Sequence, residues 1–321
     1  MKLQPVVLAR PGLLGHVLLI AVSLTSGLLT LGCGTGQAGS LGPVPADSRT
    51  SSGSASSPPS SPAPASQSPG DRPSTAPASP TPRPTRQIVL QAWFTRSGKL
   101  FVTERTIPAT TGVARAAISS VLAGPSAAET SAAVRSQIPA GTALRGVRIS
   151  GRIATVDLSS SFVSSASTST MPLRIAQVVF TVTQFPSVKG VRFAINGQDV
   201  TVLGGVPVQS PQTRSILSGY LPAITVQGPS IGEQVSSPVT ISGTADVFEA
   251  TVSVRLLDAD GHEIARTFTT ATCGTGCRGS YSASITYSVS KTQRGVIEVF
   301  ESSAQNGQPI KVQQIPVILI A

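Results

Sequence analysis

The sequence predicts two folded parts of different class behind a long segment that has no core: an α/β part, in which helices cover one face of a small mixed sheet, and an all-β sandwich. Residues 34–86 contain twelve prolines and only two large aliphatic side chains, Leu41 and Val44. In 87–205, alternating apolar residues typical of strands are interrupted by stretches with helical spacing. From 223 to 321, short strand-like runs follow one another between turn residues. We therefore expect a linker at 206–222 between the two folded parts.

The first 33 residues have the pattern of a secretory signal. Lys2 and Arg10 precede an apolar run that ends at Leu31-Gly32-Cys33. This segment resembles a bacterial lipoprotein signal, and the resemblance implies that Cys33 is acylated and becomes the mature N-terminus. An uncleaved transmembrane anchor is the alternative, because the run is nearly long enough to span a bilayer. Both interpretations place the remaining residues outside the cytoplasm, and the first predicts a chain lipid-anchored at the outer face of the cell membrane.

Residues 34–86 cannot bury enough apolar surface to offset the entropy of ordering the chain, so we expect a disordered Pro/Ser/Ala linker. A flexible coil of this length has a root-mean-square span of about 40 Å. Such a tether lets the folded parts stand off the membrane.

The α/β part has clear signals for each element. Gly124-Pro125 ends a helical pattern, and Ser126 and Glu129 have the spacing of a capping box. Pro172 at a first turn and Pro186 beyond the end favour a buried helix for a stretch whose β-branched residues would also suit a strand. The expected elements are a hairpin at 88–104, a helix at 113–122, a short helix opening at 126, a hairpin at 147–158, a buried helix at 171–184, and strands around the hairpin dipeptide Asn196-Gly197.

Four segments of this part resemble the GerMN domain, which is named for a bacterial spore-germination protein. They are LAGPSAAE at 122–129, IPAGTAL at 138–144, ATVDLSSSF at 154–162 and AQVVFTVTQFPSVKGVRFAINGQ at 176–198. The resemblance implies a non-enzymatic binding or assembly module, similar to ring-forming envelope domains, with no catalytic residues to assign. From the residues themselves, Asp157 ends a strand near serines able to cap the next turn.

The last part shows seven strand-like runs, as expected for an immunoglobulin-like sandwich. They lie at 224–227, 239–242, 250–257, 263–270, 280–289, 296–301 and 310–320. The segments at 237–261, 270–281 and 299–307 resemble the immunoglobulin-like Gmad domain that often accompanies GerMN. The order of domains implies an envelope protein related to sporulation or germination.

Two cysteines remain outside the signal, in the segment Cys273-Gly274-Thr275-Gly276-Cys277. In an oxidising compartment this pair is expected to form a local disulfide, which would fix a loop. Zinc would need two further ligands, and His262 is the only nearby candidate.

The formal charge of +10 is unevenly distributed. Residues 87–205 hold eleven basic and four acidic side chains, a net of +7, whereas 224–321 hold six and eight, a net of −2. Outside the cytoplasm, this favours anionic lipid or acidic wall polymer over nucleic acid as the partner of the first folded part. The arginines are scattered along the sequence, so an ordinary solvated surface is the competing interpretation.

Catalytic and ligand-binding motifs are weak. His262 follows Asp258 and Asp260, but the chain has no G-x-S-x-G elbow, and these carboxylates with Glu263 match turn chemistry better than a calcium loop. Among the aromatic residues, Trp93 has the strand parity of an exposed position but is as well suited to cover a neighbouring element.

Tyr281 and Tyr287 share a strand face and are expected in the core, and Tyr220 is a further aromatic candidate for carbohydrate binding. We therefore expect no catalytic residue, metal or cofactor. The predicted function is binding or assembly in the cell envelope, with envelope proteins or a second copy as partners. The alternative is an enzyme, or an enzyme activator, that acts on peptidoglycan or acidic polysaccharide, and variants at His262 and Asp157 would distinguish the two.

Overall fold

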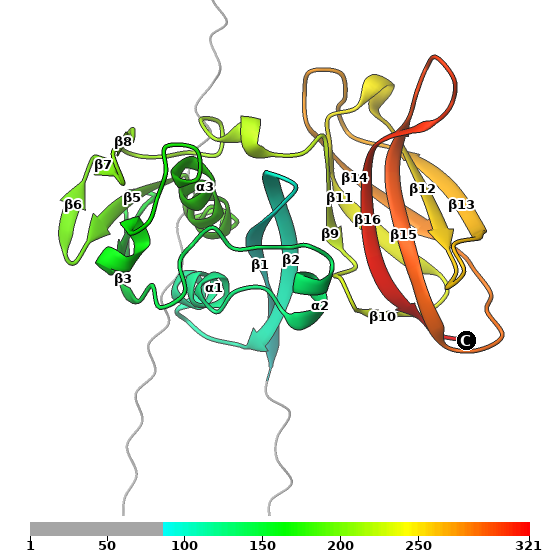
Figure 1. Ribbon diagram of the computed structural model, residues 1–321, viewed down its shortest axis with the longest axis horizontal. Coiled ribbons are helices and arrows are strands. Elements are labelled where there is room, and N and C mark those ends of the chain that lie inside the picture. The colour runs from blue at the N-terminus through cyan, green and yellow to red at the C-terminus, as the bar shows by residue number, and fades with distance from the viewer. Residues whose placement is uncertain (1–85) are drawn as a thin grey trace, which may run out of the picture. The chain divides into compact units, whose positions relative to one another are not determined.

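The computed structural model describes residues 86–321 (Figure 1). The predicted signal with Cys33, and the predicted linker apart from Arg86, lie outside the described residues. Within 86–321, none of the helices combines the length and the apolar character needed to cross a bilayer.

The α/β part contains two main sheets and a small third one formed by β7 and β8. The hairpin of β1 and β2 forms a sheet of its own, and β3-β4-β5-β6 form a four-stranded sheet in which β4 and β5 are parallel. The elements are β1 (Gln87–Arg96), β2 (Lys99–Pro108), α1 (Val113–Leu122), α2 (Ala127–Ser131), β3 (Leu144–Ser150), β4 (Ile153–Leu158), the 3-10 turn η1 (Ser160–Val163), α3 (Met171–Val182), β5 (Gly190–Ile195), β6 (Gln198–Val200), and the small hairpin β7 (Val202–Leu203) and β8 (Val206–Pro207).

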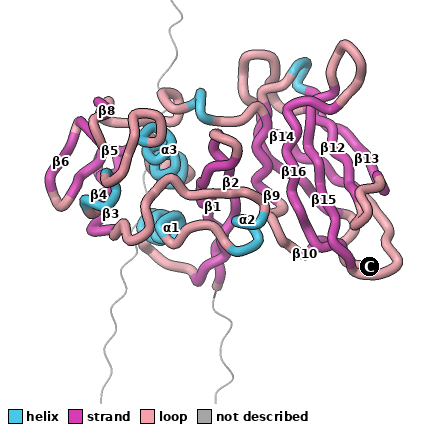
Figure 2. Tube along the Cα trace, viewed as in Figure 1, coloured by secondary structure: helices cyan, strands magenta, loops and turns pink. Residues whose placement is uncertain are grey.

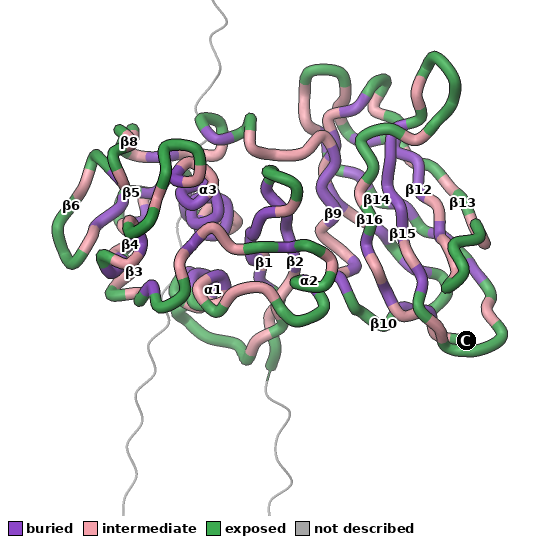
Figure 3. Tube along the Cα trace, in the orientation of Figure 1, coloured by how far each residue is buried: buried purple, intermediate pink, exposed green. Residues whose placement is uncertain are grey.

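Helices α1 and α3 lie between the first hairpin and the four-stranded sheet, and both contact β1 (Figures 1 and 2). Helix α3 packs against the β1–β2 hairpin, against α1 and against the four-stranded sheet, so nearly all of its residues are buried (Figure 3). A helix covered on nearly every side is mostly apolar all round, which explains why its sequence is also compatible with a buried strand. The prediction of a mixed sheet with helices on one face is confirmed, and the hairpin adds a cover to their other side.

The turns follow the predicted chemistry. Ser97-Gly98 and Asn196-Gly197 both have positive φ at their two residues, as a tight hairpin turn requires. The capping box of α2 is formed, with Ser126 accepting from the N–H of Glu129 and Glu129 accepting from the N–H of Ser126. The serine at the start of the turn after Asp157, Ser159, makes no side-chain capping hydrogen bond, and the carboxylate of Asp157 accepts from the N–H of Gly197 at 3.0 Å.

The last part is a two-sheet sandwich. One sheet has the order β14-β11-β9 and the other β10-β16-β15-β12-β13. Its elements are β9 (Ile224–Gly228), β10 (Gln234–Val235), β11 (Val239–Ala245), the 3-10 turn η3 (Phe248–Ala250), β12 (Thr251–Leu257), β13 (Glu263–Thr270), β14 (Gly279–Ile285), β15 (Gln293–Ser302) and β16 (Pro309–Leu319). All seven predicted strands are present, and β10 adds a short eighth.

Residues 86–321 belong to one compact unit. Hydrogen bonds join the first hairpin to the segments beyond it: Lys99 Nζ donates to the carbonyl of Gly219 at 2.8 Å, and the N–H of Glu104 donates to Ser230 Oγ at 3.2 Å. Burial is the main cause that raises the pKa of Glu104, and the negative charge of Glu233 adds to it. The two folded parts therefore share a polar interface.

The predicted linker at 206–222 packs onto the α/β part. Gln212 exchanges two backbone hydrogen bonds with Val191, each 2.8 Å long. Arg214 donates to the carbonyl of Phe180 at 2.7 Å and to Thr183 Oγ1 at 2.8 Å, at the C-terminal end of α3. Further on, the 3-10 turn η2 (Ser218–Tyr220) leads to β9. The segment is thus held at defined points of the first part.

Candidate functional site

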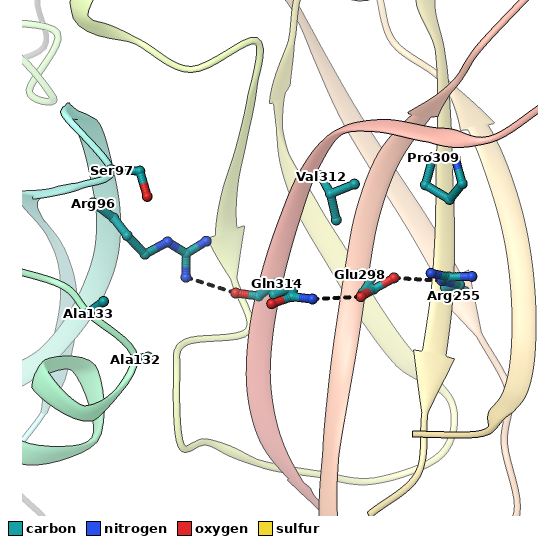
Figure 4. Close-up of a pocket in the computed structure, with 9 residues that line it drawn as sticks. All are labelled: Arg96, Ser97, Ala132, Ala133, Arg255, Glu298, Pro309, Val312 and Gln314. Atoms are coloured by element: carbon teal, nitrogen blue, oxygen red, sulfur yellow. Dashed lines mark hydrogen bonds and ion pairs between the residues drawn. The ribbon is translucent and has the colours of Figure 1, made fainter. Parts of the chain in front are cut away.

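A groove lies between the turn of the first hairpin and the outer face of the five-stranded sheet (Figure 4). Its volume is about 650 Å³. The first part contributes the tip of the β1–β2 hairpin and the residues that follow α2, and the second part contributes three adjacent strands. The lining residues are Arg96, Ser97, Ala132, Ala133, Arg255, Glu298, Pro309, Val312 and Gln314.

A chain of hydrogen bonds crosses the groove. Strand register places Arg255 opposite Glu298 and Glu298 opposite Gln314 on β12, β15 and β16. Glu298 accepts from Arg255 Nε at 2.6 Å and from Gln314 Nε2 at 2.8 Å (Figure 4). From the other part, Arg96 donates to the carbonyl of Gln314 at 2.9 Å and to Gln313 Oε1 at 3.1 Å. Since Glu298 is only 5% exposed, these contacts keep a buried carboxylate paired.

Next to this row of hydrogen bonds, Arg266 and Phe300 continue the contacts of Arg255 along the sheet. Arg255 and Arg266 stack over Phe300, with guanidinium carbons 5.5 and 5.6 Å from the ring centre. Glu263 forms an ion pair with Arg266 at 2.6 Å, and the hydrogen bond from Arg266 is the largest cause that lowers the pKa of Glu263. The neighbouring Phe268 is 72% exposed. The groove is therefore lined by charged and polar side chains whose positions are fixed by bonds to one another, with further charged and aromatic side chains beside it.

The acidic turn between β12 and β13 is held mainly by bonds among its own residues. His262 is exposed, and its Nδ1 lies 3.6 Å from Asp258. Asp258 Oδ1 accepts from the N–H groups of His262 at 2.8 Å and Asp260 at 3.0 Å. The bond from His262 is the main cause that lowers the pKa of Asp258. Ligand atoms of these three residues lie within 4.8 Å of one another, but Glu263 is directed to Arg266 instead.

Cys273 and Cys277 form a disulfide, with Cα atoms 5.8 Å apart, in the loop between β13 and β14. The loop is fastened to the segment around η3. The N–H of Thr275 donates to the carbonyl of Val247 at 2.9 Å, and the N–H of Gly276 donates to Asp246 at 2.9 Å. The disulfide thus closes a loop that is also held by hydrogen bonds.

The aromatic residues are mostly unavailable as a carbohydrate platform. Trp93 is 2% exposed and packs on Phe180, with ring centres 4.9 Å apart, while Arg214 covers both rings. Of the two interpretations that strand parity left open for Trp93, the second holds: it covers a neighbouring element, because α3 and the segment carrying Arg214 lie over that face of β1. Tyr281 and Tyr287 are buried, as predicted, and burial raises the pKa of Tyr281. Tyr220 is half-buried.

Sequence reasoning did not identify the groove. Arg96 and Gln314 are more than two hundred positions apart, and neither belongs to a recognisable motif. Phe268 carried a usable signal, because it stands between threonines on a strand predicted at 263–270, where parity opposite to the core indicates exposure.

Comparisons with known proteins agree with this architecture. Residues 93–201 match the family model described as "Sporulation and spore germination", and residues 223–308 match that of the "Immunoglobulin-like domain of bacterial spore germination". None of the curated proteins compared with the chain matches it.

Two solved structures from Bacillus subtilis are similar to parts of the chain. The tandem GerMN domains of the sporulation protein GerM share 17% identity and a TM-score of 0.36, over 58% of this chain and 60% of that one. The first GerMN domain of the same protein shares 20% identity and a TM-score of 0.32, over 40% of this chain and 98% of that one. The chain thus spans about three fifths of the tandem-domain structure.

Proposed function

Since the chain combines a GerMN domain with the immunoglobulin-like Gmad domain of bacterial spore germination, we propose that it is a lipid-anchored envelope protein that acts in sporulation or germination by binding, without catalysis of its own. The proposed boundaries are 87–205 for the first domain and 223–321 for the second. The proposed location is the extracytoplasmic face of the cell membrane, with acylated Cys33 as the anchor.

The observation that carries this proposal is the shared groove. Two domains with germination-type family matches meet there, and each contributes charged side chains to one row of hydrogen bonds. A row that spans both domains gives a surface that neither domain has alone. We propose that this composite surface holds an envelope protein or a second copy of the chain.

Crosslinking in intact cells tests the binding role. A photoreactive side chain at position 97, in the groove, should capture a defined partner, whereas the same group at the exposed position 305, outside the groove, serves as the control. Capture of the same species from both positions, or of none from position 97, would argue against the groove as the binding surface.

Anchoring and catalysis are tested separately. Wild type should partition into the detergent phase after cell lysis, and Cys33→Ala should not carry the lipid mass. His262→Ala and Asp157→Asn should keep the cellular phenotype of the wild type, provided that both variants fold. Loss of the phenotype in folded His262→Ala would instead support the alternative of a wall-directed enzyme.

A further inference from the structure

The basic side chains of the first domain are scattered along the sequence. In the fold, some of them bond to other residues of the molecule and others face solvent. Arg105 is paired with Glu129 at 2.6 Å, and Arg174 is buried against the carbonyls of Phe162 and Ser164. Arg96 belongs to the groove. These three have defined partners inside the molecule, so they do not contribute to a free basic surface.

Four other cations gather on one end of the four-stranded sheet. Strand register places Arg148 opposite Thr155 and Thr155 opposite Arg192, on β3, β4 and β5. Strands in a sheet are about 4.8 Å apart, so the backbones at the two arginines are about 10 Å apart. At the end of the same strands, the N–H of Lys189 donates to the carbonyl of Arg152 at 2.7 Å, which places these two cations side by side.

This group faces solvent. Val156 and Phe193, which alternate with Thr155 and Arg192, are buried on the opposite face, toward the helices. All four cations are exposed, and none of them takes part in an ion pair among residues 86–321; Arg152 also donates to the carbonyl of Pro186 at 3.1 Å, a bond that leaves its charge unpaired. We call Arg148, Arg152, Lys189 and Arg192 the basic sheet end.

The acidic residues of the sheet lie toward its other end. Register places Asp157 opposite Ala194 and Ala194 opposite Asp199, one row beyond Arg192, and Asp157 is bound to the N–H of Gly197. Arg145, exposed on β3 beside Asp157, lies at this end too, so four cations gather near the β3–β4 turn while the other end carries two carboxylates and one cation. The end of the sheet near the β3–β4 turn would therefore turn toward a planar anionic surface.

We propose that the basic sheet end docks on anionic phospholipid headgroups of the membrane. Each basic side chain near such a surface strengthens binding about fivefold, so four of them give a weak, reversible contact. This step rests on the proposed function, because a lipid anchor keeps the domain near the bilayer at high effective concentration, where a weak contact suffices.

Position favours a bilayer over a wall polymer as the occupant, because the proposed lipid anchor holds the first domain next to the membrane. Ile149 on the edge strand β3 is 45% exposed, but it alternates with Arg148 and lies opposite Ala154, on the face turned toward the helices, so it is not part of the basic sheet end.

Vesicle sedimentation with the chain that begins after Cys33 tests the proposal. This chain contains residues 86–321, which carry the basic sheet end. It should bind vesicles of equal parts phosphatidylglycerol and phosphatidylcholine, not vesicles of phosphatidylcholine alone, and should be released at about 0.5 M NaCl. Arg148→Gln with Arg192→Gln should weaken binding about twentyfold. The control, Lys291→Gln with Arg294→Gln, removes the same charge from exposed positions of the second domain and should bind as the wild type does.

Equal binding by the two double variants would overturn the proposal, since it would show attraction by net charge alone. Binding to a soluble phosphodiester polymer without binding to vesicles would also overturn it and identify a wall polymer as the occupant. The emission of Trp93 verifies that each variant is folded. Because this chain carries no lipid, a negative result leaves the test of Cys33 and the crosslinking result unaffected.

Discussion

Glu129 joins helix α2 to the first hairpin through a buried carboxylate, and its replacement by alanine should destabilise the first domain. Glu129 is 1% exposed. It accepts from Arg105 at 2.6 and 2.8 Å, from Thr103 at 2.6 Å, and from the N–H of Ser126 at 2.7 Å. Loss of the carboxylate's bond to the N–H of Ser126 costs about 1 kcal/mol, and loss of its charge-assisted bonds to Arg105 and Thr103 about 2 kcal/mol more. The second figure is kept low because the Arg105 side chain remains 24% exposed.

The effect depends on pH with a definite sign. Burial alone would raise the pKa of Glu129, but the hydrogen bonds from Arg105, Thr103 and Ser126 outweigh it and lower that pKa. Since the folded state prefers the carboxylate, the stabilisation is complete above the unfolded pKa of about 4.3 and is lost as the pH falls through the folded value. The difference between wild type and Glu129→Ala should therefore be largest near neutral pH and shrink in acid.

Urea unfolding followed by tryptophan fluorescence measures this directly, because Trp93 is the only tryptophan and is buried against α3. With a urea dependence of about 1.5 kcal/mol per molar, a loss of about 3 kcal/mol shifts the midpoint by about 2 M. Glu129→Gln serves as the matched control: its single amide oxygen can accept from either the N–H of Ser126 or Thr103 Oγ1, which bond to different oxygens of Glu129, so this variant should lose less stability than Glu129→Ala. A midpoint shift that is absent at pH 7, or that stays constant into acid, would refute the reasoning.

Three further substitutions test other contacts of the two domains. Glu104→Gln should stabilise the protein at pH 7, because the raised pKa of Glu104 means that the folded state favours the protonated, uncharged side chain. In the wild type this stabilisation appears only as the pH falls through the folded pKa, so the variant should gain more at pH 8 than at pH 5. Urea unfolding at both pH values measures the gain, and a loss of stability at pH 8 would contradict the prediction. Replacement of Cys273 and Cys277 by serine should cost at most about 2 kcal/mol, because the closed loop is short, and a larger fall in calorimetric stability would show that the disulfide does more than fix a loop. Gly243→Ala should destabilise the sandwich by about 3 kcal/mol, since the added methyl would overlap the carbonyl of Thr225, and a melting curve equal to that of wild type would exclude this packing.

Local signals in the sequence were sufficient for the elements. Turn dipeptides such as Asn196-Gly197, the capping box at Ser126 and the prolines around α3 act over a few residues, so their effects can be derived without the fold. The seven strands of the sandwich were predictable for the same reason, because alternation and turn residues recur in each.

The contacts set by tertiary packing could not be derived in this way. The burial of Trp93 depends on α3 and on Arg214, and strand parity carries no information about which elements cover a face. The groove needs Arg96 and Gln314 to meet across two domains. The basic sheet end needs a parallel pairing of β4 with β5, which gathers arginines that are scattered along the chain.

The contacts of Arg214 change where the molecule can be divided. A fragment that ends at residue 205 would lack the guanidinium over the indole ring and the strand pairing of Gln212, so water would reach Trp93 and its emission would shift to longer wavelength. We therefore expect the first domain to fold on its own only when residues 206–214 are included. A cleavage site that leaves both halves intact should lie after position 214.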